Sequence, residues 1–340
     1  MTLCYEPLEL HTVHVFRLAR SARSIYHNVI AEVEHNGLIG VGEAAPSSYY
    51  GESAETVVEA LTLFQDRLGE DPSALERIHQ RLDRTLDGNW AAKAAVDIAL
   101  HDLWAKQCGK PLYRLLGLGG MAPPPTSFTI AIDDVEAMQQ RVEEEAKEFE
   151  VIKVKVGASR EEEILGAIRE VWRGRIRVDA NTAWTAEQAV ERIRAIERYD
   201  LEFVEQPVEA GDLDGWKYVK DRVGLPIIAD ESARRLSDIP RLIGRVDGIN
   251  IKLMKCGGLR EALRMIHAAR AHGLRIMLGC MIESSVAISA AAHIAPLVDY
   301  ADLDGNMLTA DDPFEGVRTE GGRLILPEEP GLGVRRRSGR

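Results

Sequence analysis

From about residue 126 onward, short runs of β-branched and other apolar residues alternate with amphipathic helical stretches. The ends of eight such runs are spaced 22 to 26 residues apart, at Thr126–Ile132, Val151–Val156, Ile176–Asp179, Phe203–Glu205, Ile227–Asp230, Gly248–Lys252, Arg275–Leu278 and Tyr300–Leu303. Regular alternation of strand and helix predicts a parallel sheet. Eight strands at a nearly constant spacing predict that the sheet closes into a (β/α) barrel. No glycine-rich nucleotide motif follows any run, so a nucleotide-binding sheet is not favoured.

The first 120 or so residues follow a different, mixed pattern. Two β-type runs, Asn28–Glu34 and Leu38–Gly42, flank an Asn-Gly turn, which predicts a hairpin. Apolar residues then recur with helical spacing over Ala54–Leu68 and Ala91–Lys106. The Gly/Pro cluster from Gly117 to Pro125 follows, and it is the best candidate for a domain boundary in the chain.

The composition narrows the class of protein. With 45% hydrophobic and 28% charged residues among 340, the chain is typical of a globular protein. Lysine and arginine number 42 against 54 acidic residues, and the resulting net charge of −12 disfavours nucleic-acid binding. No run approaches the roughly 18 apolar residues of a membrane span, and no signal pattern is visible. The four separated cysteines are interpreted as reduced thiols. We expect a cytoplasmic protein without nucleic-acid or membrane partners.

Charged side chains gather at the predicted strand ends, where the active sites of (β/α) barrels lie. They are Lys153, Lys155, Asp179, Glu205, Asp230, Lys252, Asp302 and Asp304. Lys153 and Lys155 are two residues apart, so in a regular strand they face the same way. Three consecutive strands supply carboxylates, which repel one another unless a hard divalent cation lies between them. We therefore expect Mg²⁺ at Asp179, Glu205 and Asp230.

Such a site favours a reaction at a carbon next to a carboxylate. A metal ion with open positions can hold a substrate carboxylate and stabilise the dianion formed when the adjacent carbon loses a proton. Lysines on strands to either side can remove and return that proton. A nearby metal and a second lysine disfavour the charged form of such a base. The residues themselves thus indicate metal-assisted proton transfer.

Several of these residues lie in longer motifs. They are Lys153-Val-Lys155, Asp179-Ala-Asn-Thr-Ala-Trp184, Glu205-Gln-Pro207, Asp230-Glu-Ser232, Asn250-Ile-Lys-Leu-Met-Lys-Cys-Gly-Gly258 and, near the N-terminus, Gly42-Glu-Ala-Ala-Pro46. Together they resemble the enolase superfamily, its muconate-lactonizing-enzyme subgroup and, within it, the dipeptide epimerases. The resemblance covers nearly the whole chain. Its known mechanism, a lysine or histidine base beside magnesium, is a standard example of this chemistry.

The resemblance implies an α/β architecture, a TIM-type (β/α)7β barrel with an N-terminal α+β capping domain. The capping domain would span residues 1–120, completed by about 315–340, and the barrel 121–314. The implied activity is magnesium-dependent epimerisation of a dipeptide. It inverts the Cα of the C-terminal residue by two-base 1,1-proton transfer through a metal-stabilised enolate. Asp179, Glu205 and Asp230 match the family's metal ligands, and Lys155 and Lys252 match its catalytic bases. Lys255 does not align with the catalytic position.

The substrate assignment depends mainly on Asp302-Leu-Asp304, which matches the family's eighth-strand segment that binds the substrate ammonium. Other positions that match segments lining the family's substrate site are Thr129, Lys153, Cys280 and Ile282. Relatives acting on L-Ala-D/L-Glu carry an arginine in a cap loop, but the corresponding residue here is Ser21. Arg20 and Arg23 lie close by and are the alternatives for this arginine, whereas Glu52 is either a surface charge or a residue that faces a cationic substrate; the three form the possible specificity loop. The preferred side chains and the oligomeric state stay open.

Other functions fit the same residues less well. An N-acylamino acid racemase, o-succinylbenzoate synthase or muconate cycloisomerase would use the same site, but their substrates present no free ammonium to Asp302 and Asp304. A mandelate-racemase-like enzyme is disfavoured because Arg275 to Ser285 contains no histidine. A non-catalytic barrel is poorly supported, since every presumed catalytic position is present. The basic tail Arg335–Arg340 is interpreted as a solvated terminus.

Overall fold

The computed structural model describes residues 1–157 and 159–338, which form a parallel barrel and an antiparallel capping sheet. The eight parallel strands follow chain order: β4 (Phe128–Ile130), β5 (Val151–Lys155), β6 (Arg175–Asp179), β7 (Leu201–Glu205), β8 (Ile227–Ala229), β9 (Gly248–Lys252), β10 (Arg275–Gly279) and β11 (Tyr300–Asp302). A bridge between Thr126 and Ala301 links the last strand to the start of the first, and Ser127 N donates to Ala301 O at 3.2 Å. The predicted barrel is therefore confirmed.

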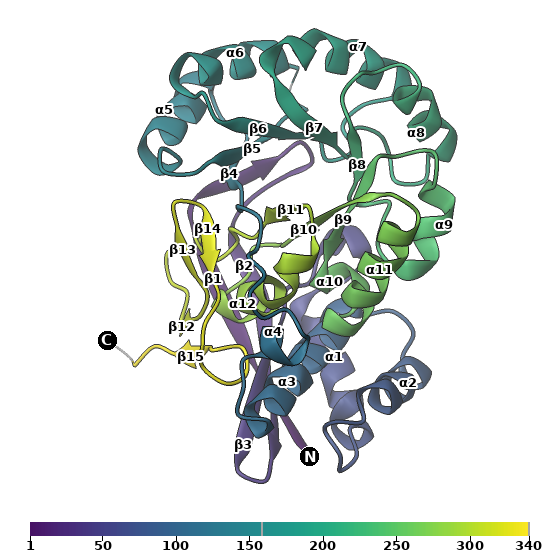
Figure 1. Ribbon diagram of the computed structural model, residues 1–340, viewed down its shortest axis with the longest axis vertical. Coiled ribbons are helices and arrows are strands. Elements are labelled where there is room, and N and C mark those ends of the chain that lie inside the picture. Colours follow the sequence, from purple (N-terminus) through teal and green to yellow (C-terminus); the bar gives the residue numbers. More distant parts are fainter. Residues whose placement is uncertain (158, 339–340) are drawn as a thin grey trace.

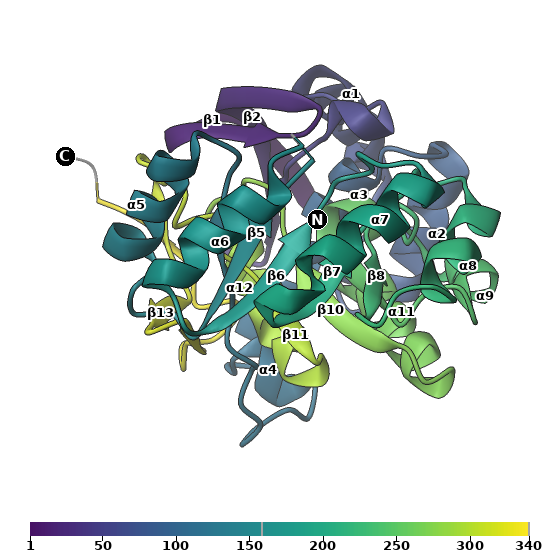
Figure 2. The ribbon, with the colours of Figure 1, turned by 90° about the horizontal axis from the view of Figure 1, so that it is seen from above.

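Helices surround the barrel, as Figures 1 and 2 show for the arc from α5 to α8. They are α5 (Val135–Glu145), α6 (Glu161–Val171), α7 (Ala186–Ile196), α8 (Leu213–Lys220), α9 (Ile239–Leu242), α10 (Leu253–Cys256), α11 (Leu259–Ala271) and α12 (Ser285–Ile294). In α7, a reciprocal capping box between Thr185 and Gln188 begins the helix, and its apolar face is buried. Every residue of α12 is buried, because this helix lies between the barrel and the capping sheet.

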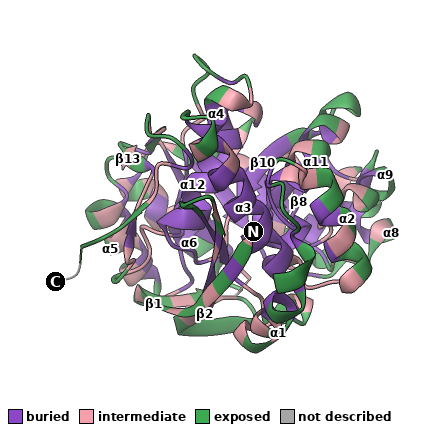
Figure 3. Ribbon diagram, turned by 90° about the horizontal axis from the view of Figure 1, so that it is seen from below, coloured by how far each residue is buried: buried purple, intermediate pink, exposed green. Residues whose placement is uncertain are grey.

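The capping region begins with three antiparallel strands, β1 (Thr2–Leu18), β2 (Ser21–His35) and β3 (Leu38–Ala44). Its helices are α1 (Ala54–Phe64), α2 (Leu75–Thr85), α3 (Trp90–Gln107) and α4 (Leu112–Leu115). β3 packs directly on the backbone of α3, since a Cβ on Gly40 or Gly42 would lie 2.0 Å from a carbonyl oxygen of α3. Figure 3 shows α3 buried in the centre, whereas much of β1 and β2 is exposed. The glycines of β3 thus bring the sheet onto the helix.

The C-terminal segment returns to the capping region. Its strands are β12 (Phe314–Glu315), β13 (Arg318–Glu320), β14 (Arg323–Ile325) and β15 (Arg335–Arg336). Short 3-10 turns complete the structure: η1 (Ser48–Tyr50), η2 (Gln65–Arg67), η3 (Glu197–Tyr199), η4 (Leu236–Asp238) and η5 (Ala295–Leu297). The buried carboxylate of Asp102 in α3 accepts hydrogen bonds from Val41 N and Leu332 N, both at 2.8 Å. One side chain thereby joins the beginning of the chain to its end.

Two sequence expectations are incomplete. The tail is exposed over residues 335–338, as expected, but Arg335 and Arg336 also pair with Glu315 and Glu6 and form β15; residues 339–340 lie outside the described part. The predicted Asn-Gly hairpin is confirmed as β2–β3, but the preceding β1–β2 hairpin was not predicted, because β1 and the first half of β2 are mostly exposed and lack an apolar alternation. In the described part of the chain, no helix has both the length and the apolar character needed to cross a membrane.

Candidate active site

Three carboxylates meet at the carboxyl ends of adjacent barrel strands. Asp179 and Glu205 are the last residues of β6 and β7, and Asp230 directly follows β8. All three are at most 1% exposed, and each offers an oxygen within 4.8 Å of the other two. The parallel register aligns Asp179 with Glu205, so the sheet itself places these side chains together. The structure thus groups the three residues that the sequence predicts as metal ligands.

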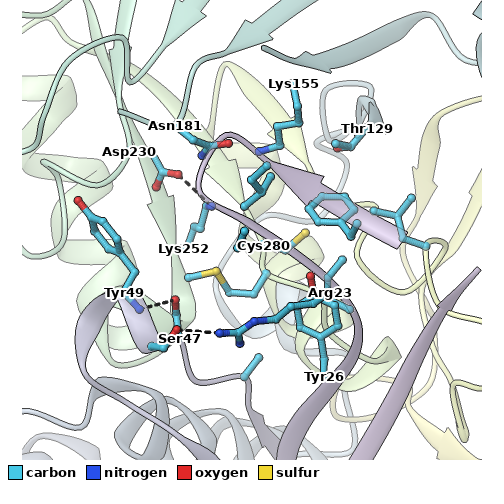
Figure 4. A pocket seen from close by; sticks show the side chains of 18 of the residues that line it. Arg23, Tyr26, Ser47, Tyr49, Thr129, Lys155, Asn181, Asp230, Lys252 and Cys280 are labelled. Atoms are coloured by element: carbon cyan, nitrogen blue, oxygen red, sulfur yellow. Dashed lines mark hydrogen bonds and ion pairs between the residues drawn. The ribbon is translucent and has the colours of Figure 1, made fainter. Parts of the chain in front are cut away.

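Two lysines flank the carboxylate cluster from the strands on either side. Lys155 Nζ, at the end of β5, lies 2.6 Å from Asp179 Oδ2. Lys252 Nζ, at the end of β9, lies 3.0 Å from Asp230 Oδ2. Both lysines line a cavity at the barrel mouth, and Figure 4 shows their side chains there. The cluster is therefore bounded by an ammonium group on each side.

Lys153 occupies a different environment, two residues earlier in β5. It is 1% exposed, and its Nζ lies 2.8 Å from Glu205 Oε2, 2.8 Å from Asp302 Oδ2 and 3.1 Å from Asp179 Oδ2. Burial lowers the pKa of Lys153, but these carboxylates outweigh it and raise the pKa well above the ordinary value. This lysine is a fixed positive charge inside the barrel.

The carboxylates differ in protonation behaviour. Burial and the neighbouring Asp179 raise the pKa of Glu205 to about 7. Burial also opposes ionisation of Asp179, but Lys155 and Lys153 outweigh it and hold the pKa of Asp179 below its ordinary value. Burial likewise opposes ionisation of Asp230, but Lys252 and Lys255 outweigh it and hold the pKa of Asp230 well below its ordinary value. The pKa of Lys252 is in turn raised, because attraction to Asp230 outweighs burial.

The cluster also contains acceptor atoms without donors. Among the described residues, Glu205 Oε2, Asn181 Oδ1, Glu231 Oε2 and Asn250 Oδ1 are buried and accept no hydrogen bond of acceptable geometry. Glu205 Oε2 lies 2.8 Å from Lys153 Nζ, yet that contact is an ion pair without hydrogen-bond alignment. Buried acceptors are normally satisfied, so this excess calls for a cation. Carboxylate and amide oxygens are the donor set that Mg²⁺ prefers, and the residues fit it.

Lys255 is a residue whose contribution the sequence did not reveal. Its buried Nζ donates to Asp230 Oδ1 at 2.5 Å, Asp230 O at 2.6 Å, Asn250 O at 2.8 Å and Ala233 O at 3.1 Å. Because these acceptors occupy its protons, Lys255 orients Asp230 and is not placed to act as a base. The available signal was the spacing of Lys252 and Lys255, which puts the second lysine on the first turn after β9.

The two eighth-strand aspartates have separate environments. Asp302 is paired with Lys153 and accepts from Ser127 Oγ at 2.6 Å. Asp304 Oδ2 accepts from Thr129 N at 2.6 Å, and nowhere in residues 1–157 or 159–338 does a cationic side chain lie within ion-pair distance of it. Burial and Asp302 raise the pKa of Asp304 to about 7. Both aspartates line the cavity, but Asp304 alone of the two lacks a cationic partner in the described structure.

Residues of the capping region cover the cavity, which has a volume of about 320 Å³. Arg20, at the tip of the β1–β2 hairpin, bonds to Glu231 at 2.7 Å and to Asn181 O at 3.0 Å. Arg23 donates to Ser48 Oγ at 3.1 Å and, in the described part of the chain, pairs with no carboxylate. Figure 4 places Arg23 and Tyr26 across the cavity from Lys155 and Asn181. Arg20 thus fastens the hairpin, while Arg23 keeps its charge uncompensated.

The remaining predicted residues divide between the cavity wall and the fold. Thr129, Cys280 and Ile282 line the cavity. Glu52 does not line it; its carboxylate accepts from Trp90 N at 2.7 Å and Ala91 N at 3.2 Å and so caps the start of α3. The sequence could not show this, because the Glu52 contact joins positions 38 residues apart.

Comparison with known proteins gives a consistent picture. Residues 7–117 match the family model "Mandelate racemase / muconate lactonizing enzyme, N-terminal domain", and residues 133–338 match "Enolase C-terminal domain-like". The chain is 42% identical to an L-Ala-D/L-Glu epimerase of Bacteroides thetaiotaomicron, over 98% of this chain and 88% of the relative.

Solved structures agree. A dipeptide epimerase from Enterococcus faecalis, complexed with Mg and L-Leu-L-Tyr, superimposes with a TM-score of 0.94 at 38% identity, covering 98% of each chain. A substrate-liganded L-Ala-D/L-Glu epimerase from Bacillus subtilis superimposes with a TM-score of 0.94 at 33% identity, also covering 98% of each chain.

Proposed function

We propose, on the premise that this chain belongs to the enolase superfamily and to its dipeptide epimerases, that it inverts the Cα of the C-terminal residue of a dipeptide. One observation carries the proposal. Lysines from β5 and β9 flank three buried carboxylates from β6, β7 and β8, at one mouth of one barrel. A carbon atom held between the lysines can lose a proton to one and receive a proton from the other.

In this reaction Asp179, Glu205 and Asp230 hold the magnesium ion. Bound Mg²⁺ supplies positive charge beside the substrate carboxylate and so stabilises the negative charge that develops when the α-proton leaves. Lys155 and Lys252 exchange protons with opposite faces of the Cα atom. Lys153 and Lys255 hold the surrounding carboxylates in place through their buried contacts.

The free ammonium of the dipeptide binds Asp304. This aspartate lines the cavity, has one oxygen bound to Thr129 N, and has no cationic partner in the described residues. A substrate ammonium supplies that partner through charge-assisted hydrogen bonds. Asp302 is already paired with Lys153, so its contribution to ammonium binding is indirect. An N-acyl amino acid would offer Asp304 no such partner, which disfavours the N-acylamino acid racemase alternative.

The side chain of the C-terminal residue extends toward the capping region. The relatives differ here: the Bacteroides protein is an L-Ala-D/L-Glu epimerase, whereas the Enterococcus protein was crystallised with L-Leu-L-Tyr. The uncompensated guanidinium of Arg23 favours an acidic side chain. We therefore propose an L-Ala-D/L-Glu-type substrate.

A dipeptide library tests the proposal. L,L-Dipeptides are incubated with the protein and Mg²⁺ in deuterated water and analysed by mass spectrometry and chiral chromatography. We expect deuterium at one Cα and the appearance of the L,D-diastereomer, fastest with a C-terminal glutamate, and no exchange after chelation. Exchange confined to N-acyl amino acids would instead identify a racemase of that class. No exchange with any substrate of either kind would reject both.

A further inference from the structure

Two buried carboxylates of the capping region bind the first turns of consecutive barrel helices. Glu43, in β3, accepts from Ser284 N at 2.9 Å, Ser284 Oγ at 2.6 Å and Ala287 N at 3.2 Å, at the start of α12. Asp97, in α3, accepts from Leu259 N at 2.5 Å and Arg260 N at 3.3 Å, at the start of α11. Both carboxylates are fully buried. The same chemistry therefore joins cap to barrel at two places.

Only the Glu43 joint continues to the cavity. Asn28 Nδ2, in β2, donates to Glu43 Oε1 at 2.8 Å and to Ile282 O at 3.1 Å. Asn28 and Ile282 both line the cavity. Asp97 instead contacts His79 and His101, and neither histidine lines it. Both carboxylates thus bind the first turn of a barrel helix, but only Glu43 is connected, through Asn28, to a residue that lines the cavity.

The segment from Cys280 to Ser284 has no regular secondary structure of its own, and Cys280, Met281 and Ile282 form a wall of the cavity. Its backbone contacts within the segment include Met281 N, which donates to Glu283 Oε1 at 2.8 Å. From the cap, Asn28 binds Ile282 O and Glu43 binds Ser284 N. A segment without a hydrogen-bonded ladder takes its position from such contacts, so the cap determines where this wall lies.

We propose that Asn28 and Glu43 are positioning residues that fix the position of the cavity wall directly after β10, formed by Cys280, Met281 and Ile282. Neither performs chemistry; they act through the backbone of Ile282 and Ser284. The inference about substrate affinity rests on the proposed function, whereas the placement of the wall does not. The capping region therefore shapes the pocket at its base as well as at its hairpin tip.

The variant Asn28→Asp tests the pair with almost no change in shape. It replaces the donating amide by a carboxylate oxygen that faces Glu43 and the Ile282 carbonyl, so both bonds become repulsive. We expect faster hydrogen exchange of backbone amides in 280–287. We also expect KM for the preferred dipeptide to rise about tenfold, the effect of one or two lost hydrogen bonds, with kcat and Mg²⁺ affinity changing less than about twofold.

A double variant distinguishes an effect on the position of the cavity wall from an effect on the stability of the contact between cap and barrel. In Asn28→Asp with Glu43→Gln, the new amide at position 43 donates to the new carboxylate at 28 and still accepts from Ser284. The bond between cap strands returns, but nothing donates to Ile282 O. Asn28→Asp alone should lower Tm. We therefore expect the double variant to regain most of that loss in Tm while its KM stays as high as in Asn28→Asp. Recovery of KM together with Tm would show that Asn28 acts only through stability and would overturn the proposal.

Asp97→Asn is the matched control, since it weakens the joint at α11. It should lower Tm without raising KM or the exchange of 280–287. An equal rise in KM in this variant would also overturn the proposal, as would unchanged exchange and KM in Asn28→Asp. If the wild-type protein epimerises no dipeptide, the proposed function fails by itself. The exchange measurements on 280–287 then still decide whether Asn28 places the wall.

Discussion

The barrel mouth and the cap meet across one cavity but hold charge in opposite ways. At the mouth, the carboxylates of Asp179, Glu205 and Asp230 each lie within 3.0 Å of a lysine ammonium. On the cap side, Arg23 has only a serine hydroxyl as partner among the described residues. A dense network of paired charges on rigid strands suits proton transfer, since its geometry changes little during reaction. A single unbalanced charge on a hairpin suits selection of substrates.

This comparison predicts that mouth variants change turnover, whereas cap variants change substrate preference. The strongest challenge is Glu205→Gln, which removes a charge at nearly constant size. We expect Mg²⁺ affinity to fall by more than about 100-fold and both exchange and epimerisation to disappear, because the change affects a direct ligand. Calorimetric Mg²⁺ titration and turnover measure the two effects. Glu191→Gln, on the exposed face of α7, is the control and should match wild type. Near-normal turnover in the Glu205 variant would remove the carboxylate cluster from the mechanism.

The next largest effect concerns the two lysines. Lys155→Ala and Lys252→Ala should each slow epimerisation by about 100- to 10,000-fold, since each removes the acid or base for one face. Each variant should still exchange the α-proton of one diastereomer, and the two should retain opposite ones. Deuterium incorporation into L,L- and L,D-dipeptides, measured separately, gives the result. Equal loss with both diastereomers in both variants, with folding and metal binding intact, would contradict opposed bases.

The eighth strand lies at the border between the two regions. Asp304→Asn should lower kcat/KM for free-amine dipeptides by about 10- to 100-fold, the effect of one lost charge-assisted contact, and affect N-acetyl dipeptides much less. Asp302→Asn should reduce stability, because it leaves Lys153 with one carboxylate fewer. The ratio of the two specificity constants is the readout. If neither variant alters this ratio, Asp302 and Asp304 do not bind the ammonium. The N-acylamino acid racemase alternative would then be favoured.

The two cap arginines sharpen the comparison further. Arg23→Gln should reduce kcat/KM for L-Ala-L-Glu by about tenfold, as expected for one exposed charged contact, and leave L-Ala-L-Leu nearly unchanged. Arg20→Gln should weaken both substrates alike, because Arg20 holds the hairpin tip to Glu231 and Asn181. Kinetics with the paired substrates distinguish the two. If Arg20→Gln lowered kcat/KM for L-Ala-L-Glu alone, Arg20 and not Arg23 would be the residue that binds the glutamate side chain.

The smallest effect lies where cap and barrel join. Burial and Glu43 raise the pKa of Glu283 to about 8. Between its ordinary value and pH 8 the folded protein keeps a proton that the unfolded chain releases, so stability falls as pH rises through this window. Glu283→Gln should abolish that dependence, so its stability relative to wild type should be higher at pH 9 than at pH 5. Urea unfolding at both pH values measures it; parallel pH profiles of the two proteins would contradict the shift.

The sequence predicts the mouth better than the cap for a physical reason. Side chains at strand ends have directions fixed by the pleat and by the register of neighbouring strands, so Asp179, Glu205 and the flanking lysines could be placed from spacing. The family resemblance added their roles, and the comparisons confirm the family.

Contacts that join distant parts of the chain were beyond such reasoning. The pairing of Lys153 with Asp302 spans 149 residues and that of Asn28 with Ile282 spans 254. Neither leaves a periodic signal. Glu52 was misplaced for the same reason, because a helix cap and a binding residue look alike until the partner is known. The exposed β1–β2 hairpin was not predicted, because solvent on both faces removes the apolar alternation that marks a strand.

The bonds of Asp102 to Val41 and Leu332 have a consequence for biosynthesis. A ribosome releases the chain from its N-terminus, so α3 emerges long before the segment that donates the second bond. Every strand of the barrel is also made before that segment. Until Leu332 arrives, Oδ1 of this buried carboxylate lacks its donor, although Val41 N and Lys106 Nζ can already bind Oδ2, and α3 is not yet joined to the C-terminal segment. We expect a nascent protein that ends just after β11 to contain every residue of the proton-transfer site and still be more readily cleaved by proteases than the full-length chain.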